Sequence, residues 1–489
     1  MRQTVRYLRR GSVVSLEGID PNLTLLDHLR IDCRATGTKE GCNEGDCGAC
    51  TVVLARRRGD DLVYMPVNAC ILLAGQVDGA EVITVDDLAD GGALHPVQQA
   101  MVDHHASQCG FCTPGIVMSL FALYQDGARP VERQAIVDQL AGNLCRCTGY
   151  RPIIDAAKAA CAGRPADRFC AGREARLAAL AEISDSEDVF LGTEARFFAA
   201  PASLESLIAL YAAHPDARLV AGATDVGLWL TKKLDDIPKL IWLGRVAGLD
   251  AIVHGDGGLV IGATVTLDQA APALGALDPD LGEVMRRFGS TQVRSSGTVG
   301  GNIANGSPIG DLAPCLIALD STMTLRSLAG ERRMPLADFF IGYGRQNRAA
   351  GEVLTAVTVP ALVEGQHFRA FKVSKRFDED ISAVMGAFRI AVADGRITGA
   401  RVAFGGMAAT PKRAAATERC LLGARIDDPA TWEGAIDMLG SDYQPLDDMR
   451  ASAAYRLATA RALLEKALFE IGAAPSTLTR IIGHREARP

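Results

Sequence analysis

The sequence predicts a multidomain α+β protein, and three observations lead to this fold class. The chain has 489 residues, which is long for one hydrophobic core and corresponds to about three domains. Residues 1–90 are rich in short runs of β-formers between polar and glycine turns, whereas helical spacing of apolar residues begins at Leu94. Beyond residue 190 strands and helices mix again.

Composition excludes several classes of function. The chain is 48% hydrophobic and 22% charged, as expected of an ordinary globular protein. Its net charge of −7 leaves no basic surface for nucleic acid, and it has no run of eighteen apolar residues that could span a membrane. The arginine-bearing first ten residues lack the features of a targeting peptide, so we interpret them as a first strand and expect a cytoplasmic protein.

The first domain, residues 1–90, is expected to be a small sheet crossed by one helix. That helix is predicted over Leu25 to Arg30, after the capping residue Thr24. A cysteine loop lies where the edge of this sheet is expected, which is typical of a β-grasp, ferredoxin-like arrangement.

Four cysteines of this domain have the spacing of an iron–sulfur site. In GCNEGDCGACTVV, four residues separate Cys42 from Cys47 and two separate Cys47 from Cys50, and nineteen residues separate Cys50 from Cys70. This is the spacing of plant-type [2Fe–2S] ferredoxins, in which thiolates supply tetrahedral sulfur to each iron.

Glycines surround these ligands at Gly41, Gly45 and Gly48. Without a Cβ atom they allow the loop to wrap closely and to adopt positive φ angles. Backbone N–H groups are then expected to point toward the cluster sulfurs.

Residues 91–162 are predicted to form a four-helix bundle. Pro114 follows Thr113 at a first-turn position, and Gly127 and Gly142 are placed as helix stops. A second cysteine quartet lies at the helix ends of this bundle, at Cys109, Cys112, Cys145 and Cys147.

The second quartet alone leaves the metal open. Its CxxC and CxC pairs, 32 residues apart, suit structural zinc or a second [2Fe–2S] cluster. The specific spacing of the first quartet favours clusters at both sites, and the absence of a secretory signal argues against disulfides. His104 and His105 are expected to be surface or capping residues. The remaining cysteines are expected to be buried free thiols, namely Cys33, Cys161, Cys170, Cys315 and Cys420.

The region after a predicted linker, residues 163–190, contains two glycine-bearing loops. They are RLVAGATDVGLW, residues 218–229, and SSGTVGGNIANGSPIGD, residues 295–311. Loops of this kind present successive N–H groups to a pyrophosphate, although tight turns alone explain them equally well. Neither matches the Rossmann or P-loop motif. Because a flavin exchanges one electron with a cluster and two with a diffusible acceptor, we interpret residues 191–362 as an FAD-binding domain and residues 366–475 as a further α+β domain.

Several segments together resemble the xanthine dehydrogenase branch of the molybdenum hydroxylase family, in particular its bacterial small subunits with Fe–S and FAD domains. They are GTKEGCNEGDCGACTV, HPVQQAMVDHHASQCGFCTPG, GNLCRCTGYRPI, TVGGNIANGSPIGD and SKRFDEDISAV. The resemblance extends from the first strand to about residue 460.

This resemblance implies a vanillyl-alcohol-oxidase-type FAD domain followed by a C-terminal flavoprotein domain. It also places Tyr343 and Asp225 near a nicotinamide, and the charged loop Lys375 to Asp380 beside the flavin. The implied FAD-binding residues are Leu219, Val220, Ala221, Gly222, Ala223, Thr224, Asp225, Val226, Phe288, Thr298, Val299, Gly300, Gly301, Asn302, Asp311, Leu354 and Lys372.

By resemblance, hydroxylation takes place at a molybdopterin cofactor on a large partner subunit, in a heterotetramer of two small and two large chains. Electrons are then expected to pass through two [2Fe–2S] clusters to FAD and on to NAD. Two other interpretations stay open: the Fe–S/FAD subunit of a molybdenum hydroxylase for aldehydes or N-heterocycles, and a non-catalytic adaptor structured by zinc.

Overall fold

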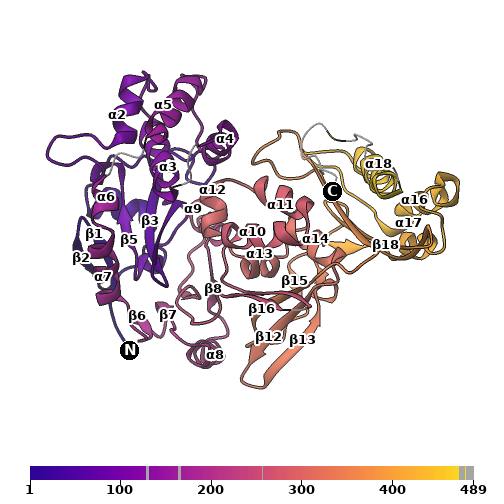
Figure 1. Ribbon diagram of the computed structural model, residues 1–489. Helices are drawn as coiled ribbons and strands as arrows, with labels where there is room; N and C mark the ends of the chain where they lie inside the picture. The colour runs from indigo at the N-terminus through magenta and orange to yellow at the C-terminus, as the bar shows by residue number, and fades with distance from the viewer. Residues whose placement is uncertain (128–130, 164–166, 256, 473–479, 481–489) are drawn as a thin grey trace. The chain divides into compact units, whose positions relative to one another are not determined.

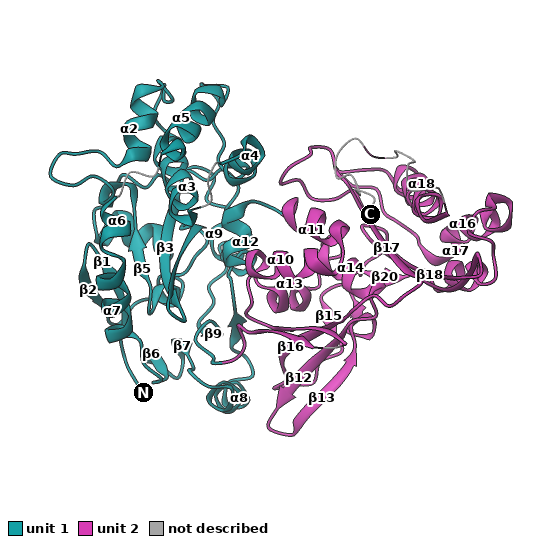
Figure 2. Ribbon diagram, in the orientation of Figure 1, with its two compact units in different colours: residues 1–247, 289–297 teal, residues 248–288, 298–489 magenta. Residues whose placement is uncertain are grey.

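The computed structural model describes residues 1–127, 131–163, 167–255, 257–472 and 480 (Figure 1). Its chain divides into two compact units (Figure 2). The first comprises residues 1–247 and 289–297, and the second comprises residues 248–288 and 298–489. Segment 289–297 therefore belongs to the first unit, although both of its sequence neighbours belong to the second.

The first unit begins with a five-stranded sheet in the order β2-β1-β5-β3-β4. The predicted helix is confirmed, since the Thr24 hydroxyl accepts a hydrogen bond from the Asp27 N–H at 3.1 Å. The helix continues as a π-helical turn, η1. The elements are β1 (Val5–Arg9), β2 (Ser12–Leu16), α1 (Leu25–Asp27), η1 (His28–Asp32), β3 (Thr51–Arg58), β4 (Asp61–Asn68), η2 (Ala74–Val77), β5 (Glu81–Ile83) and η3 (Val85–Asp87).

Four helices follow, as the sequence predicts: α2 (Pro96–Asp103), α3 (Thr113–Asp126), α4 (Arg133–Leu140) and α5 (Arg151–Ala162). Helix α3 begins with Pro114 in its first turn and ends at Gly127, whose φ of +82° is the left-handed conformation that glycine adopts readily. Phe121 of α3 is fully buried in a core that it shares with Val53 and Ile83 of the sheet. The helices thus cover one face of that sheet.

The interpretation of residues 163–190 as a linker is wrong for the part that the structure describes. This segment contains α6 (Arg168–Ala171) and α7 (Arg173–Ile183). Leu180 and Ile183 of α7 are buried against Leu8 of β1. The segment is rich in arginine and alanine, which are strong helix formers, and its apolar stripe needs only two residues at i and i+3.

A second sheet of this unit has the order β6-β7-β9-β8, with β7, β9 and β8 parallel. Phe198 and Trp242 of this sheet share one core with Tyr7 and Leu54 of the first sheet. The elements are β6 (Val189–Thr193), β7 (Arg196–Ala200), α8 (Leu204–Ala213), β8 (Arg218–Val220), α9 (Val226–Thr231), β9 (Lys239–Trp242) and α12 (Thr291–Ser296).

The second unit contains an antiparallel sheet in the order β10-β11-β16-β12-β13, a two-stranded sheet β14-β15, and several helices. Buried side chains of α10, α13 and α14 pack with those of β11, β12 and β16 in one core. The elements are β10 (Ile252–Gly255), β11 (Gly258–Gly262), α10 (Leu267–Leu277), α11 (Pro279–Arg286), α13 (Val299–Asn305), α14 (Leu312–Ala318), β12 (Thr322–Ser327), β13 (Gly330–Pro335), η4 (Leu336–Asp338), β14 (Phe340–Gly342), β15 (Arg345–Gln346) and β16 (Val353–Pro360).

The chain continues in this unit with a sheet of order β17-β18-β19-β20. Its three long strands and the helices that follow them agree with the α+β domain predicted for residues 366–475. The elements are β17 (Gln366–Val373), β18 (Val384–Ala393), β19 (Arg396–Gly405), β20 (Lys412–Arg413), α15 (Ala415–Leu421), η5 (Pro429–Thr431), α16 (Glu433–Asp437), α17 (Leu439–Asp442) and α18 (Ala453–Gly472).

Candidate functional site

The first cysteine quartet is assembled by the β3–β4 pair and the loop before it. Thr51 of β3 lies opposite Asn68 of β4 in the ladder. Cys50 therefore precedes one strand, and Cys70 follows the other, at the same end of the pair. Both are buried, whereas Cys42 and Cys47 on the loop are half-buried.

These four thiols lie in two hydrogen-bonded pairs. The N–H groups of Cys42 and Cys47 each donate to the other residue's sulfur at 3.3 Å, and Cys50 and Cys70 share a side-chain hydrogen bond. The hydrogen bond from the Cys47 thiol favours the thiolate form of Cys42 and lowers its pKa. Two pairs of sulfurs are the donor set that the two irons of a [2Fe–2S] cluster require.

The glycines of this loop have the close contacts that the sequence predicts. A Cβ on Gly41 would lie 2.7 Å from Cys47 Sγ, and one on Gly45 would lie 2.4 Å from Ile71 Cδ1. Gly45 also has a φ of +76°. The tight wrap around Cys47 depends on these missing side chains, and the residues present thus fit a cluster.

The second quartet again pairs off, at the end of the bundle where α3 begins. Cys112 is the N-cap residue of α3 and shares a hydrogen bond with Cys145, while Cys109 does so with Cys147. Cys109 and Cys147 are exposed, so this site lies at the protein surface. In the part of the chain that the structure describes, no three His, Cys, Asp or Glu side chains converge on a single-metal site.

The two cysteine loops contact each other directly. The Leu144 N–H, next to Cys145, donates to the carbonyl of Cys47 at 3.0 Å. A Cβ on Gly48 would lie 2.0 Å from the Gly142 carbonyl oxygen. Backbone thus packs on backbone here, and one hydrogen bond joins a cysteine of the first quartet to the neighbour of a cysteine of the second.

A buried glutamine, Gln292 of α12, fixes this junction. Its Nε2 lies within hydrogen-bond distance of three acceptors, Thr51 Oγ1 at 3.2 Å, Ser119 Oγ at 3.1 Å and Asn143 Oδ1 at 3.0 Å. These three partners come from β3, α3 and the second cysteine loop. Sequence reasoning missed Gln292, because no local motif surrounds it.

The first quartet also contacts the first glycine-bearing loop. A Cβ on Gly227 would lie 2.4 Å from the carbonyl oxygen of Ile71, the residue after Cys70. The amide of Gln76 donates to the carbonyl of Ala221 at 2.8 Å. The loop over residues 218–229 is therefore held against the chain that follows Cys70.

Lys232 joins the same two parts of the first unit. Its Nζ donates to the carbonyl of Cys42 at 2.9 Å and forms an ion pair with Glu44, also at 2.9 Å. A cation therefore lies beside the first cysteine loop. The lysine lies 190 positions from Cys42 in the sequence, so that only the fold reveals it.

The first glycine-bearing loop has the geometry of an anion-binding turn. Ala223 has a φ of +61°, and among the described residues the N–H groups of Gly222, Ala223 and Thr224 have no hydrogen-bond partner. Consecutive N–H groups around a left-handed residue form a nest that binds anions such as phosphate. This loop fits the pyrophosphate of FAD. Glycine is required at position 222, because a Cβ there would lie 1.9 Å from the carbonyl oxygen of Ser296.

The second loop differs from the expectation. It begins α13, and the N–H groups of Val299, Gly300, Gly301 and Asn302 donate to acceptors within the chain, including the Thr298 hydroxyl at 3.0 Å from the Gly301 nitrogen. The prediction that these N–H groups face a pyrophosphate is wrong for these four. Glycine at position 300 serves packing, because a Cβ there would lie 2.6 Å from the Ala263 carbonyl oxygen.

Two predicted flavin-site residues of the second unit form a buried ion pair. Lys372 Nζ lies 2.6 Å from Asp311 Oδ2, and the two side chains are 3% and 7% exposed. Asp311 also accepts from Ser382 Oγ at 2.5 Å, and Lys372 donates to the carbonyl of Arg287, beside Phe288, at 3.1 Å. Lys372 is therefore not a solvated surface charge.

Other residues of the second unit that the sequence predicts near the flavin or the nicotinamide lie outside the Lys372–Asp311 ion pair. Leu354 is buried in the core, opposite Leu325 of β12, and Tyr343 is 76% exposed. The loop Lys375 to Asp380 is fastened by an ion pair between Arg376 and Asp380. The FAD contact of Leu354 and the nicotinamide contacts of Tyr343 and Asp225 stay predictions.

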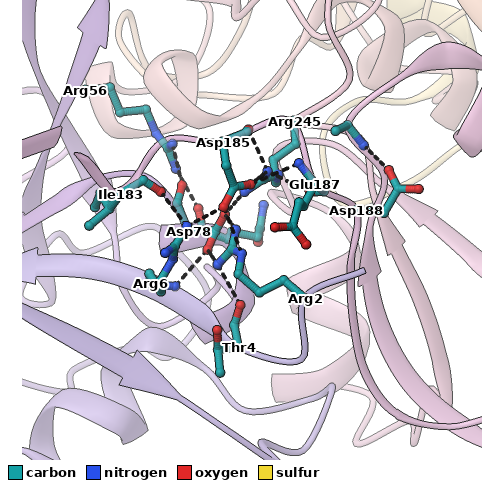
Figure 3. Close-up of polar contacts among 12 residues, drawn as sticks. Arg2, Thr4, Arg6, Arg56, Asp78, Ile183, Asp185, Glu187, Asp188 and Arg245 are labelled. Carbon is teal, nitrogen blue, oxygen red and sulfur yellow. Dashed lines mark hydrogen bonds and ion pairs between the residues drawn. The ribbon is translucent and has the colours of Figure 1, made fainter. Parts of the chain in front are cut away.

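A network of arginines and aspartates, absent from the sequence predictions, braces the first unit (Figure 3). The buried Asp78 carboxylate accepts two hydrogen bonds at 2.8 Å from Arg2 and also pairs with Arg245. Arg56 donates to the carbonyls of Asp78 at 3.0 Å and Gln76 at 2.6 Å. The network thereby connects the N-terminal strand to η2, whose Gln76 holds the loop at Ala221.

Family models match three consecutive parts of the chain. The [2Fe-2S] binding domain matches residues 84–158, the FAD binding domain in molybdopterin dehydrogenase matches residues 193–362, and the CO dehydrogenase flavoprotein C-terminal domain matches residues 369–471. The chain belongs to the molybdenum hydroxylase family. Its multidomain α+β fold agrees with that of the Fe–S and FAD subunits of molybdenum hydroxylases.

Individual molybdenum hydroxylases show how far the likeness extends. The xanthine dehydrogenase of Emericella nidulans is 33% identical over 90% of the chain and 36% of its own length. The carbon monoxide dehydrogenase of Hydrogenophaga pseudoflava matches with a TM-score of 0.53 and 28% identity, over 55% of this chain and 95% of the other. Quinoline 2-oxidoreductase of Pseudomonas putida 86 matches with a TM-score of 0.51 and 29% identity, over 56% and 95%.

The chain spans little more than a third of the length of the xanthine dehydrogenases that it matches. As a molybdenum hydroxylase chain with [2Fe–2S] and FAD domains it is an electron-transfer component. None of its described helices is both long enough and apolar enough to cross a bilayer. The predicted domain boundaries and the cytoplasmic location stay predictions.

Proposed function

We propose that this chain is the electron-transfer subunit of a xanthine dehydrogenase. In this proposal a large molybdopterin subunit hydroxylates hypoxanthine and xanthine to urate. Electrons pass from it through two [2Fe–2S] clusters and FAD of this chain to NAD. The assembly is a heterotetramer of two small and two large subunits.

The observation that supports a relay most directly is the contact between the two cysteine loops. Cys109 and Cys147 of the second quartet are exposed at the protein surface, where a partner subunit can approach them. The first quartet lies behind the second, joined by the hydrogen bond from Leu144 to Cys47 and facing the loop at Ala221. This arrangement favours entry at the second quartet and exit toward the flavin.

The bound groups supply the redox chemistry, since clusters exchange single electrons and flavin converts these to a two-electron transfer. The eight paired cysteines would hold the clusters. The N–H groups of residues 222–224 would bind the FAD pyrophosphate. Lys372 and Asp311 would fix the charge and orientation of groups near the flavin, and the burial of both side chains excludes water from them.

The experiment is co-purification of this chain with the molybdopterin subunit, followed by assays with xanthine and NAD. We expect urate and NADH in equal amounts. A complex that turns over xanthine only with O2 would contradict the NAD step, and one inert toward xanthine would contradict the substrate.

A second candidate function is the same relay in a molybdenum hydroxylase for another substrate. The likeness to carbon monoxide dehydrogenase and quinoline 2-oxidoreductase favours it over the zinc-structured adaptor. In both candidates the large subunit would carry the substrate site. Turnover of aldehydes or N-heterocycles by the same complex, in place of xanthine, would therefore favour this second candidate.

A further inference from the structure

The turn η1, which follows α1, carries a Cys–His–Asp group that neither the cluster sites nor the flavin residues use. Cys33 Sγ lies 3.4 Å from His28 Nε2, and His28 Nδ1 lies 2.9 Å from Asp32 Oδ2. A single π-helical turn, η1, produces this geometry, because the Cys33 N–H donates to the carbonyl of His28 at 3.0 Å. A nucleophile, a base within reach and a carboxylate that orients the base are the parts of an activated thiol.

The His28 imidazole is buried and fixed by hydrogen bonds beside the Cys33 thiol. Its side chain is 4% exposed, and its Nε2 lies 2.8 Å from the hydroxyl of Tyr7 on β1. The same hydroxyl lies 3.8 Å from Cys33 Sγ. Arg9 of β1 adds a positive charge that stabilises the thiolate. The Cys33 sulfur therefore lies near hydrogen-bond donors from both η1 and β1.

These contacts favour a thiolate beside an imidazolium. The hydrogen bond from His28 lowers the pKa of Cys33. Burial disfavours a charged His28 ring, but its hydrogen bonds to Cys33 and Asp32 outweigh this effect and raise its pKa. The thiolate is the reactive form of cysteine, and partly exposed thiolates beside a positive charge are the ones that react.

Access distinguishes Cys33 from Cys161 and Cys315, and its histidine partner distinguishes it from the half-buried Cys170, whose thiol donates to Gln125 Oε1 at 3.6 Å. Cys161 and Cys315 are buried, whereas Cys33 is half-buried with the exposed Asp32 beside it. Cys420 is exposed, contrary to the sequence expectation, but among the described residues it has no histidine or carboxylate partner.

We propose that Cys33 is an oxidant-sensitive modification site whose reaction partner is a hydroperoxide. The Cys33 thiolate attacks one peroxide oxygen, so that an S–O bond forms and the O–O bond breaks. The leaving alkoxide, or hydroxide when the peroxide is hydrogen peroxide, takes the proton from His28 Nε2 and departs as the alcohol or water. Sulfur is oxidised by two electrons to a sulfenic acid, and the peroxide is reduced by two.

The modified residue would lie close in sequence to the first cysteine loop. Six residues after Cys33, the Lys39 N–H donates to the carbonyl of Ala49, between the ligands Cys47 and Cys50, at 3.3 Å. The thiol site stands apart from the proposed function, since it depends on neither the substrate nor NAD.

The test treats the intact holoprotein with a limiting amount of hydrogen peroxide in the presence of dimedone, which traps sulfenic acids, and locates the label by peptide mass spectrometry. We expect label on Cys33 to exceed that on Cys420 on the order of tenfold, despite the greater exposure of Cys420. Cys33→Ser should remove it. Visible absorption recorded alongside reports whether the clusters stay intact.

Two further variants test the role of the histidine. Asp32→Asn, at an exposed position, and His28→Gln should each reduce labelling of Cys33 severalfold and leave that of Cys420 unchanged. Asp32→Asn keeps the test decisive if His28→Gln fails to fold. Equal labelling of Cys33 and Cys420, or labelling of Cys33 that Asp32→Asn leaves unchanged, would overturn the proposal.

Discussion

At the scale of single residues, the candidate cluster sites combine paired sulfurs, missing side chains and a few remote polar groups. The spacing of the cysteines predicts both quartets, because ligand geometry limits how many residues can lie between ligands of one cluster. It cannot predict Lys232 or Gln292, since the fold brings these side chains to the cysteine loops from more than 140 residues away. The ion pair between Lys372 and Asp311 likewise cannot be predicted without the fold.

Lys232→Gln should lower the midpoint potential of the first cluster by roughly a few tens of millivolts. The neutral side chain removes a positive charge beside the loop of Cys42, and that charge favours the reduced, more negative cluster. An EPR-monitored redox titration measures the shift. Lys233→Gln is the matched control, because Lys233 lies over the Trp229 ring. Equal potentials in both variants would rule out the tuning role.

Gly48→Ala should destabilise the first unit by more than about 2 kcal/mol and reduce its iron content. A Cβ at this position would lie 2.0 Å from the Gly142 carbonyl oxygen, at a φ of +68°. Gly79→Ala has nearly the same φ, +69°, but meets no atom within 4 Å, and should cost about 1 kcal/mol. Thermal unfolding and iron analysis compare the two, and equal losses would mean that the contact between the loops is unimportant.

Lys372→Met should destabilise the second unit by about 3–5 kcal/mol and weaken FAD retention, because it leaves the buried Asp311 carboxylate without its cation. Adding Asp311→Asn removes the unpaired charge, so the double variant should regain part of the stability. Denaturant unfolding and the flavin absorbance that survives gel filtration are the measurements. Additive losses would show that the two side chains act independently.

At the scale of elements, the sequence predicts most helices and strands. The role that it predicts is wrong for two segments, α7 and the loop at residues 298–302. Helix α7 lacks a wide apolar stripe, so its composition resembles a linker, yet Leu180 and Ile183 are enough to dock it on Leu8. The loop at residues 298–302 is rich in glycine, yet its N–H groups are taken up by a capped helix and by the backbone at Ala263. Glycine content alone does not distinguish close packing from anion binding.

Leu180→Ala should lower the stability of the first unit by about 2–4 kcal/mol, since a buried leucine leaves a cavity when shortened. Leu177→Ala, a half-buried leucine of the same helix, is the matched control and should cost clearly less. Thermal unfolding followed by circular dichroism compares them. An unchanged midpoint for Leu180→Ala would restore the linker interpretation.

At the scale of the whole molecule, the two compact units are not consecutive in the sequence. Segment 289–297 leaves the second unit and is built into the first, where Gln292 contacts the surroundings of both cysteine loops. Sequence patterns predict consecutive domains and miss this exchange, because it depends on contacts between distant segments. The central claim for the molecule is that two clusters and one flavin share this chain.

EPR spectroscopy of the purified chain, reduced without oxygen, tests that claim most directly, together with iron, zinc and flavin analysis. The relay predicts two distinct [2Fe–2S] signals, with about four iron atoms and one FAD per chain. Cys147→Ala should remove one signal and leave FAD bound. A single signal in the unmodified chain, or zinc in place of iron, would contradict the account.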